Sequence, residues 1–163
     1  MKNAAAVLGA YGRYHRKPET ILTDFVGVPL IYLGILVVLS WVSLPLMHIS
    51  LSWIAVIGLL ACYIYIDPAL GLVSTAFLLP LTLLAGIMAG FHFNFFSLGM
   101  AVSLFVFGWA AQLLGHYLEG NRRVVLGNFN QVFIAPLFLV AEFVFLLGFR
   151  KELEREMKNA KGT

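Results

Sequence analysis

The chain has 163 residues, of which 61% are hydrophobic and 12% are charged, and its mean hydropathy is +0.91. This composition lies far outside the range of soluble domains and predicts an integral membrane protein. The net charge of +3 is accompanied by no nucleic-acid motif, so we expect no nucleic-acid partner and assign the basic residues to contacts with anionic lipid. Cys62 is the only cysteine, which excludes an intramolecular disulfide and a cysteine-based zinc site.

Five apolar stretches follow one another along the chain. The first, Phe25–Leu44, has about 20 residues without a charge, enough at 1.5 Å per residue to cross a hydrocarbon core of roughly 30 Å. The next three are Leu51–Ile66, Ala69–Gly90 and Phe95–Leu118, and the fifth is Val132–Phe149. None shows the alternation of a membrane barrel. We therefore predict an all-α fold, an integral membrane helical bundle with four transmembrane helices plus a fifth hydrophobic helix that is re-entrant or spanning.

The basic residues predict the orientation, because Lys and Arg collect on the cytoplasmic side of a membrane. We expect a cytoplasmic arm that contains site residues (1–24), a membrane domain (25–149) and a charged cytoplasmic tail (150–163). The membrane is the inner membrane in a bacterium or the endoplasmic reticulum in a eukaryote. Pro136 and Glu142 favour a fifth helix that turns back and leaves the tail inside. The alternative is five full spans, which would put the basic tail on the side opposite the cytoplasm, against the usual preference of Lys and Arg.

Polar residues that can bind a metal lie at the ends of the apolar stretches. Gln112, His116 and Glu119 are spaced four and three apart and share one face of a helix that ends at Glu119. The arm adds His15 and Asp24 at the same expected membrane face. Two imidazoles with one or two carboxylates match the ligands of non-haem Fe(II), and zinc accepts the same ligands. The alternatives are an arginine partner for Glu119 and a role for Asp24 as the N-cap of the first span.

Three blocks of the sequence carry a resemblance to a known family: YGRYHRKP followed by Val28-Pro29, then GWAAQLLGHYLEG, then NFNQVFIAPLFLVAEFVF. In these blocks the chain resembles the small membrane proteins related to the fungal endoplasmic-reticulum 2-hydroxy fatty acid dioxygenase. The resemblance implies an Fe(II)-dependent enzyme in the lipid bilayer that uses O2 to shorten a long-chain 2-hydroxy fatty acid by one carbon. It also implies catalytic roles for His15, His116 and Glu119.

The resemblance places four residues as metal ligands, His15, Asp24, His116 and Glu119. This chain departs from the family pattern twice, with Asp24 in place of a histidine and Gly127 in place of an aspartate. Aspartate also binds iron, so Asp24 preserves a ligand or marks a member with another substrate or none. Five further polar residues are expected to hydrogen-bond to the ligands or to the substrate: Tyr14, Gln112, Asn128, Gln131 and Glu142.

Two residues and the function itself leave alternatives open. His92 stands at the family's spacing before Gly108-Trp109, but four full spans put it at the opposite membrane face. Either His92 is not a ligand, or the second and third helices do not cross. Glu142 is costly among apolar residues unless it is paired, protonated or hydrated, so it either bonds polar neighbours or orients a ligating histidine. The alternative function is a non-catalytic lipid-binding scaffold or small transporter, and nothing in the sequence sets the oligomeric state.

Overall fold

The computed structural model describes residues 2–13, 18–44, 49–90, 93–119 and 130–161. In these residues it has seven helices and one short hairpin: α1 (Lys2–Gly12), α2 (Pro18–Ser40), β1 (Ser43–Leu44), β2 (Ile49–Ser50), α3 (Leu51–Ile66), α4 (Pro68–Ala89), α5 (Phe95–Glu119), α6 (Asn130–Leu146) and α7 (Lys151–Lys161). The predicted helical class is confirmed. The antiparallel β1–β2 pair was not predicted, because two-residue strands leave no recognisable pattern.

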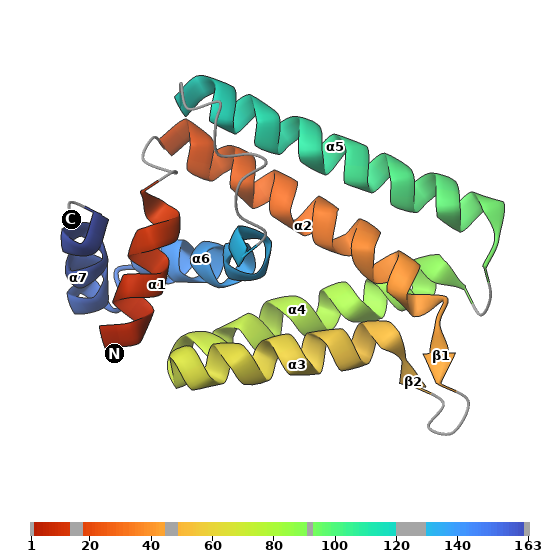
Figure 1. Cartoon of the computed structure of the whole chain (residues 1–163), viewed down its shortest axis with the longest axis horizontal. Coiled ribbons are helices and arrows are strands. Elements are labelled where there is room, and N and C mark those ends of the chain that lie inside the picture. The colour runs from red at the N-terminus through yellow and green to blue at the C-terminus, as the bar shows by residue number, and fades with distance from the viewer. Residues whose placement is uncertain (1, 14–17, 45–48, 91–92, 120–129, 162–163) are drawn as a thin grey trace.

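The helices form two antiparallel pairs, and three further helices gather at one end of these pairs. α2 lies along α5 and α3 lies along α4, and α2 also contacts α4 (Figure 1). α1, α6 and α7 lie where α2 begins and α5 ends (Figure 1). We call this the arm end, defined by Pro18 at the start of α2 and Glu119 at the end of α5. The β1–β2 hairpin lies at the opposite end.

Three helical segments are long and apolar enough to cross a membrane within the described part of the chain: Glu19–Ser40, Pro68–Ala89 and Phe95–Leu118. α3 and α6 have 16 and 17 residues and span about 24 and 26 Å at 1.5 Å per residue. Both are apolar but shorter than the hydrocarbon core. The three long helices agree with the predicted membrane bundle, and the count of four crossings plus a fifth helix stays a prediction.

The start of α2 differs most from the prediction. This helix begins at Pro18 and not at Phe25, because proline is favoured at the first helical position and the first turns tolerate polar residues. Asp24 therefore lies inside the helix, and its interpretation as an N-cap is wrong, since a cap precedes the first helical residue. The true aspartate cap is Asp67, whose carboxylate accepts hydrogen bonds from the backbone N–H groups of Ala69 and Leu70 at 3.1 and 3.0 Å.

α2 and α5 approach closely because small residues meet at three levels, spaced seven residues apart on each helix: Thr20 with Gly115, Gly27 with Gly108 and Gly34 with Ala101. The Thr20 hydroxyl donates to the Gly115 carbonyl at 3.3 Å. Glycine, alanine and threonine are the residues that let membrane helices pack backbone to backbone. This contact fixes the two helices that carry most of the predicted site.

The first turn of α6 is held inside the bundle by two tyrosines. Pro136 has no N–H, so the carbonyl of Val132 four residues earlier has no helical donor. The Tyr32 hydroxyl of α2 donates to that oxygen at 2.7 Å, and the Tyr63 hydroxyl of α3 donates to the Phe133 carbonyl at 2.5 Å. Replacement of a lost backbone bond is required where water is absent. The start of α6 therefore lies against the interior of α2 and α3.

The other end of α6 leads back to the arm end. A turn with positive φ at Gly148 and Arg150 connects α6 to α7, and the Arg150 guanidinium forms an ion pair with the buried carboxylate of Asp67. α7 then packs on α1, where a Cβ on Gly9 would lie 2.8 Å from the Cβ of Ala160. The N-terminal helix and the last helix are therefore direct neighbours.

Candidate functional site

Four polar side chains are buried between α2 and α5 at the arm end. Thr20 and Asp24 of α2 are each 1% exposed, and Gln112 and His116 of α5 are 8% and 7% exposed. The spacing of four residues puts each pair on one face of its helix, and the close α2–α5 contact brings Thr20 to Gly115 and Gln112 to Gly27. We call Thr20, Asp24, Gln112 and His116 the polar cluster.

Tyr11 brings α1 to the polar cluster. Its ring packs against Phe138 of α6 with ring centroids 4.7 Å apart, and it is buried. Burial raises the pKa of Tyr11 well above its usual range, and the negative charge of Asp24 and the nearby Tyr32 raise it further. This electrostatic influence means that the Tyr11 hydroxyl lies near the Asp24 carboxylate and stays protonated at neutral pH.

Gln112 contributes a hydrogen-bond donor to the cluster. Its Nε2 atom is buried and has no hydrogen-bond partner among the residues that the structure describes. The same atom lies 3.0 Å from the position that a Cβ on Gly27 would occupy, so the glycine makes room for the amide. A buried donor without a partner costs about 1–3 kcal/mol, and such a group is suited to bind an oxygen of a ligand.

The predicted metal site is described only in part. Asp24 near the start of α2 and His116 near the end of α5 are both buried, so the structure brings one carboxylate and one imidazole to the same end. Within the described residues, no three His, Cys, Asp or Glu side chains form a metal-binding group. His15 and Tyr14 belong to the connection between α1 and α2 and lie outside the described residues. Glu119 ends α5, and its side chain also lies outside them.

The remaining predicted residues belong to other parts of the chain. Asn128 and the side chain of Gln131 lie outside the described residues, and so does His92. The described neighbours of His92, such as Phe93 against Trp41, are at the end opposite the arm end. Glu142 is half-buried on α6, and its role stays a prediction.

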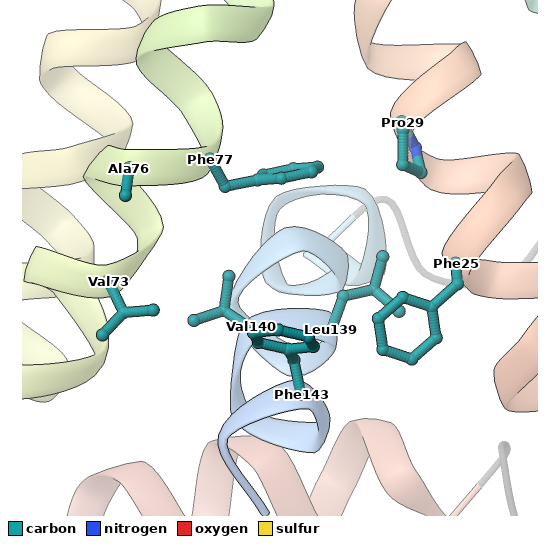
Figure 2. A pocket seen from close by; sticks show the side chains of 8 residues that line it. All are labelled: Phe25, Pro29, Val73, Ala76, Phe77, Leu139, Val140 and Phe143. Carbon is teal, nitrogen blue, oxygen red and sulfur yellow. The ribbon is translucent and has the colours of Figure 1, made fainter. Parts of the chain in front are cut away.

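An apolar cavity of about 380 Å³ lies between α2, α4 and α6 (Figure 2). Phe25 and Pro29 form its α2 wall, Phe77 extends from α4, and Leu139 and Phe143 extend from α6. Phe25 directly follows Asp24 on α2, so the cavity and the polar cluster lie at the same level of this helix. No sequence pattern indicates this cavity, because its lining residues are typical of any apolar helix.

The fold and the site define a small helical protein with three helices long and apolar enough to cross a membrane, buried polar groups at one end and an apolar cavity between α2, α4 and α6. The model of the family 2-hydroxy-palmitic acid dioxygenase Mpo1-like matches residues 1–147, and the chain belongs to this family. It is 29% identical over 158 residues to the 2-hydroxy-palmitic acid dioxygenase MPO1 of Saccharomyces cerevisiae, a match that covers 93% of this chain and 86% of that protein. No solved structure matches the chain. The family resemblance seen in the sequence is confirmed.

Proposed function

We propose that this protein is a membrane-embedded dioxygenase that shortens long-chain 2-hydroxy fatty acids by one carbon. The observation that carries the proposal is the burial of Asp24, Gln112 and His116 beside an apolar cavity, in a chain that belongs to a dioxygenase family. The reaction balances when one 2-hydroxy acid and one O2 give an acid with one carbon fewer, CO2 and water. An amphipathic substrate needs such a neighbouring polar and apolar site.

Fe(II) is the cofactor that we propose for this site. One carboxylate and one imidazole on facing helices fit part of the ligand set of non-haem iron, and His15 and Glu119 would complete it with Asp24 and His116. When bound, iron supplies the redox chemistry that activates O2. Zinc takes the same ligands but has no redox chemistry, so an oxygenase favours iron.

The side chains of the cluster hold the substrate and exclude water. The buried Gln112 amide N–H, which has no partner among the described residues, would donate to a carboxylate or hydroxyl oxygen of the substrate. The neutral Tyr11 hydroxyl adds a second polar group without a competing negative charge. Burial of the cluster keeps bulk water from the reacting carbons and strengthens each of these contacts.

Turnover by the purified protein tests the proposal. Wild-type protein in detergent, loaded with Fe(II), should convert 2-hydroxypalmitic acid and O2 into the acid one carbon shorter, as measured by mass spectrometry. His116→Ala should lose both iron and turnover while its melting temperature stays near wild type. Ser103→Ala, an exposed change on the same helix, is the matched control. Iron-loaded wild type without product would refute the enzyme, and failure of any preparation to bind metal would favour the scaffold or transporter.

We further propose that the arm end faces the cytoplasm and that α6 is re-entrant. The tyrosine bonds at its first turn, together with the packing of α7 on α1, support a helix that begins inside the bundle and returns to the same side. The exposed positions Ala10 and Asn159, each replaced by cysteine in a Cys62→Ser background, should react with an impermeant thiol reagent from one and the same side. Labelling from opposite sides would mean that α6 crosses.

A further inference from the structure

The cavity between α2, α4 and α6 has the size and lining of a site for an apolar chain. Every side chain that lines it is apolar, and its volume of about 380 Å³ lies in the range of small-molecule sites in proteins. An empty apolar space of this size would cost stability unless it were filled. The lining therefore predicts a hydrocarbon ligand.

The cavity lies at the level of the polar cluster on two of its helices. On α2, Phe25 follows Asp24. On α6, Leu139 follows Phe138, whose ring packs against Tyr11. A ligand that fills the cavity thus lies one residue along α2 from Asp24 and one residue along α6 from the partner of Tyr11. The deep burial of that cluster excludes the bulky headgroup of a phospholipid.

The cavity is open toward the outer surface of the bundle. Val73 of α4 and Phe143 of α6 line it and are 40% and 51% exposed. α4 is one of the helices long enough to cross a membrane, so this surface faces the bilayer. The opening therefore lets a chain dissolved in the bilayer enter sideways between α4 and α6.

Phe77 lies across the far end of the cavity. Its ring extends from α4 toward Pro29 of α2, whereas Phe25 and Phe143 lie at the end nearer to α1 (Figure 2). A chain that enters with its polar end toward Asp24 would meet this ring with its terminal carbons. Ala76, the residue before it, lines the same cavity with a side chain of minimal size.

We propose that this cavity binds the acyl chain of the 2-hydroxy acid and that Phe77 limits the length of chain it accepts. The inference rests on the proposed function, because that function supplies the substrate class. Phe77→Ala removes the stop and lengthens the site, whereas Ala76→Phe fills it. The two changes should move the preferred chain length in opposite directions.

Binding of 2-hydroxy acids of increasing chain length to wild type and variants tests this proposal without requiring turnover. Each added methylene that finds room should tighten binding about fourfold, as one buried methylene is worth about 0.8 kcal/mol. Phe77→Ala should therefore bind acids longer than the wild-type optimum at least fourfold tighter than wild type does, and Ala76→Phe should shift the optimum to shorter acids. Phe133→Ala, an exposed phenylalanine of α6 away from the cavity, should leave the optimum unchanged.

The outcomes separate this inference from the proposed function. Shifted binding without turnover by wild type supports the cavity and refutes the enzyme. If wild type turns over and both variants, Phe77→Ala and Ala76→Phe, keep its chain-length preference, the proposal that the cavity binds the acyl chain is wrong. The proposed dioxygenase function is then unaffected. If Phe77→Ala does not fold, Ala76→Phe alone still tests the acyl-chain proposal, because it should shift the preferred chain length to shorter acids.

Photo-crosslinking identifies the occupant. A 2-hydroxy acid with a diazirine at its terminal carbon should label the peptide around Phe77, and unlabelled 2-hydroxy acid should compete. Equal labelling by a diazirine phosphatidylcholine that the 2-hydroxy acid does not displace would mean that an ordinary membrane lipid fills the cavity, and the proposal would fall.

Discussion

Gly27 of α2 and Gly108 of α5 face each other so closely that a Cβ on either residue would lie 2.9 Å from the carbonyl oxygen of the other. Real Cβ atoms do not tolerate this distance to backbone without a shift of one helix. Because Gln112 is one turn from Gly108 and lies over Gly27, the glycine contact also sets how close the polar groups of the two helices come. The backbone contact therefore positions the polar cluster.

Gly108→Ala should destabilise the protein although alanine is the better helix former. The added methyl meets Gly27 and Ile31, so we expect a loss of about 1–3 kcal/mol from overpacking. Gly99→Ala on the same helix is the matched control. Nothing lies within 4 Å of its Cβ position, and the change should be neutral or stabilise by up to about 1 kcal/mol. Equal unfolding temperatures for the two variants would contradict the close contact.

Substitutions of Asp24 test its role as a ligand. Asp24→Asn keeps the shape and removes the charge, so it should lower iron affinity by about tenfold or more with an unchanged or higher melting temperature, since a buried charge is removed. Asp24→His should keep iron bound. Glu152→Gln, an exposed change on α7, serves as control. Wild-type iron content in the Asn variant would exclude Asp24 from the metal site.

The buried Tyr11 predicts a loss of stability at high pH. The folded state holds the Tyr11 proton more tightly than the unfolded chain, whose tyrosine pKa is about 10. The contribution of protonated Tyr11 to the free energy of unfolding is thus complete below pH about 10. Above that pH this contribution falls by up to about 1.4 kcal/mol per pH unit. Chemical unfolding of wild type and Tyr11→Phe should be measured at increasing pH above about 10. The free energy of unfolding should fall less steeply with pH in the variant than in wild type. Tyr65→Phe changes an exposed tyrosine, so the free energy of unfolding of this variant should fall with pH as steeply as that of wild type.

The ion pair between Arg150 and Asp67 should contribute more to stability than a surface pair. Asp67 is almost fully buried, so Arg150→Met leaves a carboxylate without its cation and should cost about 1–3 kcal/mol. Asp67→Asn removes the charge and keeps an oxygen for the two cap bonds, so it should cost less. Lys158→Ala breaks the exposed pair with Glu154 at 2.5 Å and should cost no more than about 0.5 kcal/mol. A loss for Arg150→Met as small as that for Lys158→Ala would show that the buried pair does not matter.

The long helices could be predicted from the sequence because a membrane requires unbroken apolar runs. α3 has the predicted bounds, α4 differs from its predicted bounds by one residue at each end, and α5 differs by one residue at its C-terminal end. α2 was placed too late because its first turns are polar, and polar residues there are buried against α5 and not exposed to water. Hydropathy alone does not distinguish polar residues that are buried against another helix from polar residues that are exposed to water.

For the site, the spacing of Gln112 and His116 predicts a shared face of α5, and both side chains are buried there; Asp24 is buried on α2, and its role as a ligand stays a prediction. Two further features were missed. The seven-residue spacing of Gly27 with Gly34 and of Gly108 with Gly115 is present in the sequence and signals close helix packing. The cavity had no such signal, because it arises from the arrangement of three helices that no local pattern encodes.

The pairing of α1 with α7 has a consequence for biogenesis. Two apolar side chains of α1, Ala4 and Leu8, are buried, and so are Leu153 and Met157 of α7. The two helices pack on each other, so each covers part of the apolar surface of the other. α1 is separated from α7 by the five helices α2 to α6. The apolar face of α1 therefore gains its cover from α7 only after these five helices have been synthesised.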